Sequence, residues 1–158
     1  MTILLRHTLS LFADYHQFYL QDGGLHPSPP TVWTDDDVNN RCQVAPHLVA
    51  ICPLRDMVVE VELAVHDAPP PAPSVAPDHE VTCSLDLPTG QLQIHECTGT
   101  AVLDQILAPG SYRVRVAFRN LASVSADGMD GQDSYLIELW PGEATDLVVT
   151  QRWTGPQP

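Results

Sequence analysis

Two groups of aspartates are the residues whose types and spacing point most directly to chemistry. They are Asp35, Asp36, Asp37, Asp127, Asp130 and Asp133. Carboxylates gathered in loops at strand ends can bind calcium, attract a basic protein, or serve only to cap helices and form turns. The second group does not follow the ligand order of an EF-hand loop. We predict that the six aspartates bind a basic protein partner, with calcium binding and purely structural capping as the alternatives.

Trp33 precedes the first acidic group by two residues. An exposed aromatic side chain ringed by charge is typical of the anchor residues in protein interfaces. We therefore add Trp33 to the predicted partner-binding residues. The other tryptophans, tyrosines and phenylalanines are expected mainly in the core.

The sequence carries no motif for covalent or phosphate chemistry. It has neither a Gly-x-Ser-x-Gly nucleophile turn nor a glycine-rich phosphate loop, and His95-Glu96 lacks the second histidine of a zinc-protease helix. The seven histidines are scattered, and the four cysteines contain no Cys-x-x-Cys pair that would hold zinc. We predict a protein without catalytic residues, metal or cofactor, whose cysteines stay reduced. Cys83 is expected to be buried because it is in phase with neighbouring apolar residues.

Charge narrows the range of partners. The chain has 158 residues, with 20 acidic and 7 basic side chains, a net charge of −13, and no lysine. Such a charge repels nucleic acid and anionic membranes and favours basic partners. The length suits one domain, expected over residues 1–153 with a flexible tail at 154–158. The charged residues within the first twenty positions do not form a signal peptide, so we expect a cytoplasmic location.

The elements that must position these residues are mostly strands, because the dominant pattern is alternation of apolar and polar residues. The candidate strands are 9–20, 47–52, 59–65, 81–87, 91–97, 112–119, 134–140 and 147–153. The turn at 87–90 suggests a hairpin between two of them. Short helical turns are expected at 35–40, capped by Thr34, and at 101–107. These features predict an all-β protein, an antiparallel β-sandwich of about eight strands with one or two short helical turns.

The proline-rich run at 68–73, within a loop at 68–77, cannot donate the hydrogen bonds of a sheet. We expect an exposed, stiff connection that joins two strands around the sandwich edge. Three arginines on one face of the 112–119 strand are expected to pair with glutamates across the sheet. These arginines are Arg113, Arg115 and Arg119, and the candidate partners are Glu60, Glu62 and Glu138.

Four segments carry a family resemblance. They are Asp14-Tyr15-His16-Gln17-Phe18-Tyr19-Leu20, Trp33-Thr34-Asp35-Asp36, Leu107-Ala108-Pro109-Gly110-Ser111-Tyr112 and Ser134-Tyr135-Leu136-Ile137-Glu138-Leu139-Trp140-Pro141. With these segments the chain resembles the competence protein J family from about residue 9 to residue 141. The Tyr-His-Gln-Phe and Trp-Thr-Asp pieces are the most distinctive. The loop at 68–77 and the segment around Asp127 depart from the family pattern.

The resemblance implies an acidic cytoplasmic inhibitor that pairs with a DNA-entry nuclease, or an immunity protein of a secreted toxin. It implies no catalytic residues for this chain. Charge agrees with this, because a nuclease that grips a phosphate backbone presents a basic cleft that an acidic protein can occupy. We predict a non-enzymatic bacterial inhibitor or immunity protein that neutralises a basic nuclease or toxin by covering it with an acidic surface. The alternative is a calcium- or ligand-binding β-sandwich module that uses the loop aspartates.

Overall fold

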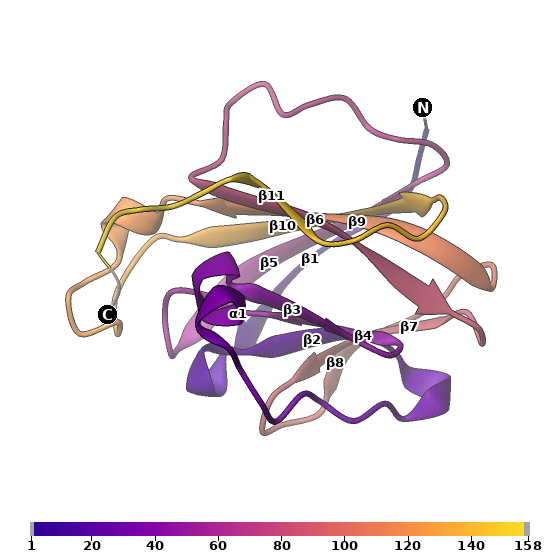
Figure 1. Cartoon of the computed structure of the whole chain (residues 1–158), viewed down its shortest axis with the longest axis horizontal. Coiled ribbons are helices and arrows are strands. Elements are labelled where there is room, and N and C mark those ends of the chain that lie inside the picture. Colours follow the sequence, from indigo (N-terminus) through magenta and orange to yellow (C-terminus); the bar gives the residue numbers. More distant parts are fainter. Residues whose placement is uncertain (1, 157–158) are drawn as a thin grey trace.

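The computed structural model describes residues 2–156, which form two β-sheets that lie one above the other (Figure 1). The strands are β1 (Ile3–Phe12), β2 (Phe18–Asp22), β3 (Cys42–Ala45), β4 (Leu48–Ile51), β5 (Val58–His66), β6 (His79–Leu87), β7 (Gln91–Glu96), β8 (Ala101–Ile106), β9 (Gly110–Arg119), β10 (Ser134–Pro141) and β11 (Val148–Gln151). The helical elements are η1 (Asp14–His16), η2 (Gly23–Leu25), α1 (Asp35–Asn40) and η3 (Leu121–Ser123). No helix in this part of the chain is long and apolar enough to cross a membrane.

One sheet has six strands in the order β1-β5-β10-β9-β6-β11, and the other has five in the order β3-β4-β2-β7-β8. All neighbouring strands are antiparallel except β5 and β10, which are parallel. The predicted all-β class is therefore correct. The predicted count of about eight strands is too low, because the described residues contain eleven.

The inner faces of the two sheets share one apolar core. Val116 and Ile137 of the six-stranded sheet and Leu20 and Ile94 of the five-stranded sheet all belong to it, and none is exposed to solvent. Cys83 belongs to the same core, as predicted. The alternation of apolar and polar residues is thus explained by one face of each strand that packs inward and one that faces outward.

Two of the expected elements are wrong. The segment expected as one strand over 9–20 is divided between β1 and β2, which belong to different sheets, and η1 separates them. Tyr15 and His16 there have a φ of 56°, which no strand permits. Residues 101–107, expected as a helical turn, form β8 and pair with β7. Pairing with a neighbouring strand decided the conformation of this short segment, which has no strong pattern of its own.

The expected hairpin at 81–97 is also wrong, because β6 and β7 lie in different sheets. Gly90 has a φ of 75°, and its amide donates to the Leu87 carbonyl, so the chain does make a tight turn there. The turn nevertheless carries the chain from one sheet to the other. Alternation indicates which side chains face inward, and both sheets offer an inner face, so the pattern cannot distinguish these two connections.

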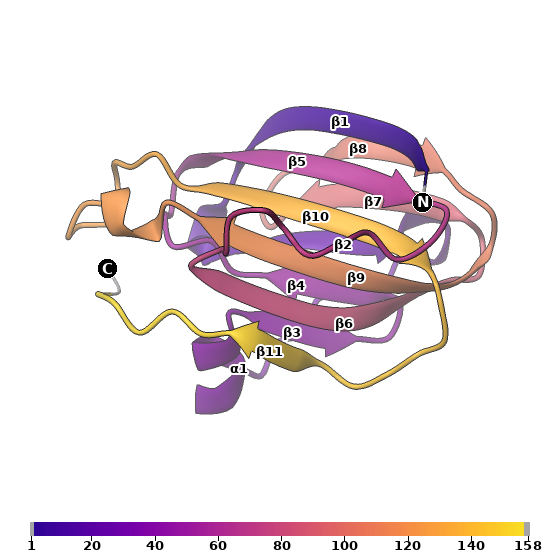
Figure 2. The ribbon, with the colours of Figure 1, turned by 90° about the horizontal axis from the view of Figure 1, so that it is seen from above.

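The proline-rich loop does not run around the edge. It joins β5 to β6, and β10 and β9 lie between these strands in the sheet. Figure 2 shows the loop crossing over the outer face of β10 and β9. Arg115 holds it there, because its Nη2 donates to the Pro71 carbonyl at 2.9 Å and to Glu138 at 2.7 Å. The predicted pairing of Arg115 with Glu138 is confirmed, whereas Arg113 donates to Ser84 and Glu62 pairs with Arg6.

The C-terminal segment begins after β11. Within it the Trp153 indole packs against the main core, and the Trp153 amide donates to His79 Nδ1 at 3.0 Å. The predicted tail at 154–158 lies partly outside the described residues, which end at 156.

Candidate functional site

The first acidic group lies on α1, and the start of this helix is held by a capping box. Thr34 Oγ1 accepts a hydrogen bond from the Asp37 amide at 3.1 Å, and Asp37 Oδ2 accepts one from the Thr34 amide at 3.0 Å. Gln43 Nε2 also donates to Asp37 Oδ2 at 3.0 Å. The predicted helical turn and its Thr34 cap are confirmed. Asp37 is half-buried, and these hydrogen bonds give it a structural role.

Asp35 and Asp36 are exposed in the first turn of the same helix. Neither forms an ion pair within residues 2–156. The partial positive charge of a helix N-terminus favours carboxylates at this position. These two side chains are available to a partner without any loss of internal contacts.

Trp33 is half-buried beside the helix. It packs against a small apolar cluster of Tyr19, Leu48 and Ala50 on the outer face of the five-stranded sheet. Trp33 also borders a pocket of about 250 Å³. The residue is therefore held in place by the fold and still presents part of its surface to solvent.

The second acidic group lies in the loop between η3 and β10. The Asp127 carboxylate accepts hydrogen bonds from Ser125 Oγ at 2.6 Å and from the Met129 amide at 3.0 Å. These bonds, first of all the one from Ser125, hold the pKa of Asp127 below its usual value. Asp127 and Asp130 are both exposed, so they remain on the surface of the loop.

Asp133 differs from the other five aspartates because it is 1 % exposed. Its carboxylate accepts from Arg55 Nε and from the Tyr135 hydroxyl, each at 2.5 Å. Burial, and then the nearby Asp133 charge, raise the pKa of Tyr135, so its hydroxyl remains a donor. Asp133 therefore stabilises the interior of the protein. Its place two residues before Tyr135, in phase with the inward face of β10, is a sequence signal of burial.

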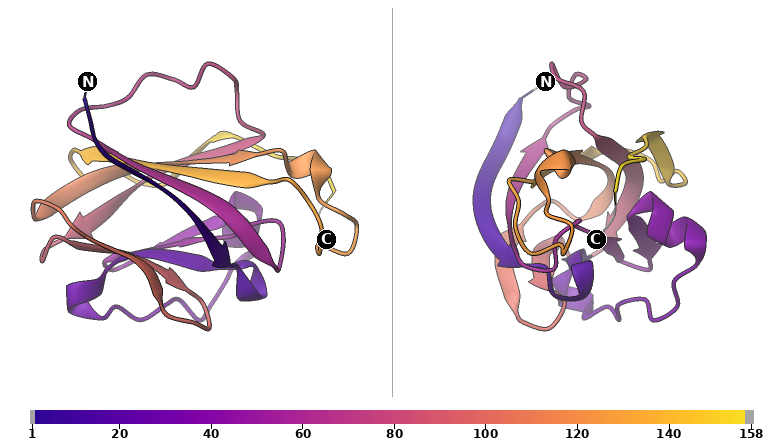
Figure 3. Two further views of the ribbon diagram at one scale, coloured as in Figure 1. Left: turned by 180° about the vertical axis from the view of Figure 1, so that it is seen from behind. Right: turned by 90° about the vertical axis from the view of Figure 1, so that its left-hand side faces the viewer.

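The two acidic groups lie at the same end of the molecule, which the right-hand view of Figure 3 faces. The helix lies beside the five-stranded sheet, and the loop with Asp127 and Asp130 lies beyond the end of the six-stranded one. No hydrogen bond or ion pair within residues 2–156 joins Asp35 or Asp36 to the loop. The exposed acidic residues therefore lie on two different elements, Asp35 and Asp36 on α1 and Asp127 and Asp130 in the loop between η3 and β10.

The described residues contain no group of three histidine, cysteine, aspartate or glutamate side chains that could hold a metal ion. The calcium alternative therefore gains no support from the geometry. The structure adds a residue that the sequence did not point to, because Arg41, at the end of α1, is buried and borders the same pocket as Trp33. A second, larger cleft of about 700 Å³ lies under the proline-rich loop.

Comparison with known proteins supports the fold. No family model and no curated protein matches the sequence. One similar solved structure is ComJ from Bacillus subtilis, the inhibitor of the DNA-degrading activity of NucA. The match covers 89% of this chain and 98% of ComJ, with 17% identity and a TM-score of 0.65. Another is the product of crocagin biosynthetic gene J. That match covers 90% of this chain and 100% of the other, with 19% identity and a TM-score of 0.60. The chain has the fold of ComJ, and at this level its resemblance to the competence protein J family is confirmed.

Proposed function

We propose that this chain is a non-enzymatic bacterial inhibitor or immunity protein that neutralises a basic nuclease or nuclease toxin in the cytoplasm. The observation that carries the proposal is the fold shared with ComJ along 89% of the chain, since ComJ inhibits the DNA-degrading activity of NucA. The mechanism is occlusion, in which the inhibitor covers the cleft that would otherwise hold DNA. No bond is made or broken, so no catalytic residue is required.

Electrostatics supports this mechanism. A nuclease needs positive charge to hold a phosphate backbone, and this chain carries a net charge of −13. The exposed carboxylates of Asp35, Asp36, Asp127 and Asp130 offer negative charge that such a cleft attracts. Complementary charge of this kind accelerates association and depends strongly on salt. Trp33 supplies an aromatic surface next to Asp35 and Asp36, where it can pack against the partner.

The first test identifies the partner and its inhibition together. The purified protein is used as bait in lysate of its native bacterium, and the bound proteins are eluted with salt and identified by mass spectrometry. A recovered basic nuclease is then assayed on plasmid DNA with increasing amounts of this chain. Inhibition that is complete near one equivalent would support the proposal. A recovered nuclease that is fully active in the presence of the folded chain would refute it.

A second test locates the interface. The double variant Asp35→Asn/Asp36→Asn removes two negative charges from α1 and leaves the Asp37 cap intact. Its matched control, Glu143→Gln/Asp146→Asn, removes two exposed charges from the loop between β10 and β11, at the opposite end of the molecule (Figure 2). We expect the α1 variant to associate several-fold more slowly than the control at low salt, and this difference to disappear near 1 M salt, where the Debye length is only about 3 Å.

Equal association rates for the two variants at low salt would exclude Asp35 and Asp36 from the interface. Asp37 and Asp133 are left unchanged in both proteins because they hold internal hydrogen bonds. A loss of binding in their variants would not distinguish a contact with the partner from local unfolding.

A further inference from the structure

The pocket beside Trp33 has mostly apolar walls. It has a volume of about 250 Å³ and opens between η1, α1 and the loop after β4. Its apolar lining comes from Tyr15, Trp33, Val38, Pro53 and Leu54. Pockets for drug-sized ligands measure about 300–1,000 Å³. This one therefore suits a smaller molecule, with an apolar body about the size of a single ring.

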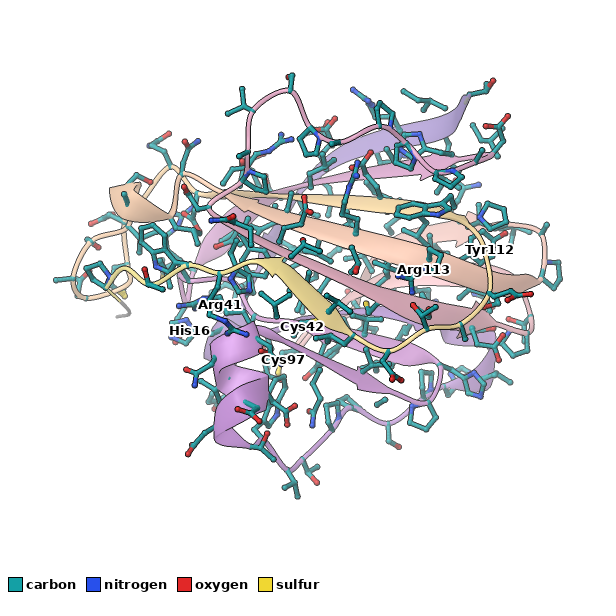
Figure 4. All side chains as sticks on the ribbon, turned by 45° about the horizontal axis from the view of Figure 1, so that its top comes forward. His16, Arg41, Cys42, Cys97, Tyr112 and Arg113 are labelled. Carbon is teal, nitrogen blue, oxygen red and sulfur yellow. The ribbon has the colours of Figure 1, made fainter. Side chains whose placement is uncertain are left out.

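Arg41 is the cation of this pocket, and it is 5 % exposed. Figure 4 shows it at the end of α1 that is nearer to the sheets, in the region of His16, which borders the same pocket. Its Nε and Nη2 are buried and have no hydrogen-bond partner among residues 2–156. Burial lowers the pKa of Arg41, yet an arginine remains charged at neutral pH. The fold therefore encloses a positive charge that forms no ion pair within residues 2–156.

Two other arginines with little exposed side chain each have a carboxylate partner, whereas Arg113, Arg119 and Arg152 form no ion pair within residues 2–156. Arg55 pairs with the buried Asp133, and Arg115 pairs with Glu138. Even the more exposed Arg6 pairs with Glu62 at 3.2 Å. An unpaired charge in the interior is costly unless it is neutralised by a partner. Because the chain has 20 acidic side chains, the lack of a carboxylate on Arg41 reflects geometry and not a shortage of partners.

The backbone around the pocket is held in an uncommon conformation. Tyr15, His16 and Arg41 have φ values of 56°, 56° and 57°, and they are three of the six residues other than glycine with positive φ in the described chain. The Arg41 carbonyl accepts from the Cys52 amide at 3.0 Å, and the His16 amide donates to the Ala13 carbonyl at 3.0 Å. Strained residues of this kind gather where a site must be preorganised.

We infer that this pocket binds a small monocarboxylic acid with an apolar, single-ring body, whose carboxylate pairs with the Arg41 guanidinium. One buried cation matches one carboxylate, and a guanidinium can hold both carboxylate oxygens through two parallel hydrogen bonds. The apolar side chains of the lining cover the ring. Because Nε and Nη2 are covered in the structure, binding includes a small rotation of the guanidinium toward the pocket. The site goes beyond the proposed inhibition and does not depend on it.

The test compares two ligands of nearly the same shape. Phenylacetate and its neutral analogue phenylacetamide are titrated into the full chain by calorimetry. We expect phenylacetate to bind at least about tenfold more tightly, as hydrogen bonds to a charged group imply. Acetate alone should bind far more weakly, because it cannot fill the apolar part of the pocket.

The variants assign the effect to Arg41. Arg41→Gln should abolish the preference for the acid over the amide. Arg119→Gln is the matched control, because it removes the same charge from an arginine that borders the other cleft and forms no ion pair within residues 2–156. It should leave the preference unchanged. Val38→Trp should weaken the binding of both ligands, because Val38 lines the pocket, is 49 % exposed, and the larger side chain would fill the space.

Three results would overturn the inference. One is equal binding of acid and amide to the wild-type chain, and another is no binding of either to the folded protein at about 10 mM. The third is a preference for the acid that persists in Arg41→Gln. If Arg41→Gln does not fold, two measurements still test the inference: the ratio of the dissociation constants of amide and acid for the wild-type chain, and the effect of Val38→Trp on binding. Nuclease inhibition is measured separately, so failure of one proposal is distinguishable from failure of the other.

Discussion

Replacing Asp133 by alanine should destabilise the protein more than replacing any exposed carboxylate. The Asp133 side chain is fully buried, and it binds Arg55, which is 12% exposed, and the Tyr135 hydroxyl. Tyr135 also accepts a hydrogen bond from the Leu54 amide at 2.9 Å. The carboxylate therefore connects the loop before β5 to the start of β10, at the end of the molecule where the acidic loop lies.

The magnitude follows from what Asp133→Ala leaves behind. Removing one partner of a buried ion pair costs about 3–5 kcal/mol, because the other charge stays uncompensated. Arg55 retains some exposure and can turn toward water, which places the expected loss near the lower limit, at about 3 kcal/mol. Tyr135 loses the acceptor for its hydroxyl but keeps its bond from Leu54, so this contact adds little to the loss.

Urea unfolding followed by circular dichroism at pH 7 measures the change. The control is Glu62→Ala, which removes the partner of Arg6 in a pair whose side chains are 31% and 54% exposed. Exposed pairs contribute about 0–1 kcal/mol, so the control should unfold at nearly the wild-type urea concentration. A loss below about 1 kcal/mol for Asp133→Ala, or a loss equal to that of the control, would refute the structural role assigned to Asp133.

The α1 cap, the buried His79 and the proline-rich loop each allow a further test. Thr34→Ala should lower the free energy of unfolding by about 1 kcal/mol in urea, whereas Thr34→Ser, which keeps the hydroxyl, should change it much less. Burial lowers the pKa of His79 from 6.5 to about 4. Between pH 6.5 and pH 4 the unfolded chain binds more protons than the folded one, so the free energy of unfolding should fall by up to about 3 kcal/mol as the pH drops through this range. Urea unfolding measured at several pH values should show this decrease, and His79→Gln should remove the part due to His79. Arg115→Met removes the hydrogen bond to the Pro71 carbonyl and should speed elastase cleavage within residues 72–76. Arg113→Met, on the same strand, should not change the cleavage rate, because Arg113 donates to Ser84 instead. Equal cleavage rates for the two variants would contradict the role of the Arg115–Pro71 hydrogen bond.

Much of the β structure could be predicted because burial imposes a period of two on each strand. In β9, Val114 and Val116 are buried while Arg113 and Arg115 are only partly buried on the other face. The pattern is local, however, and says nothing about which strands are neighbours. The parallel pairing of β5 with β10 joins residues about 70 positions apart, such as Leu63 and Ile137. Such long-range pairing depends on how all the strands fit together, so alternation alone could not reveal it.

The candidate site shows a similar limit. The aspartates at 35–37 were expected to act together, but Thr34 and Gln43 use Asp37 for hydrogen bonds, and only Asp35 and Asp36 remain exposed. The three aspartates of the second group were likewise predicted to bind a partner together. Asp133 is instead buried with Arg55, which lies 78 residues away. A carboxylate has the same chemistry in both settings, and its role depends on whether a cation reaches it within the fold.

Arg41 is the converse case, since composition alone would predict that it is paired. With 20 carboxylates and 7 arginines, each arginine has several potential partners. The position of Arg41 decides otherwise, because its φ of 57° ends α1 and leaves the side chain among the walls of the pocket. The nearest acidic residue in the sequence, Asp37, already accepts hydrogen bonds from Thr34 and Gln43. Arg41 therefore has no ion pair within residues 2–156, which is why this residue, and not the acidic surface, points to a small ligand.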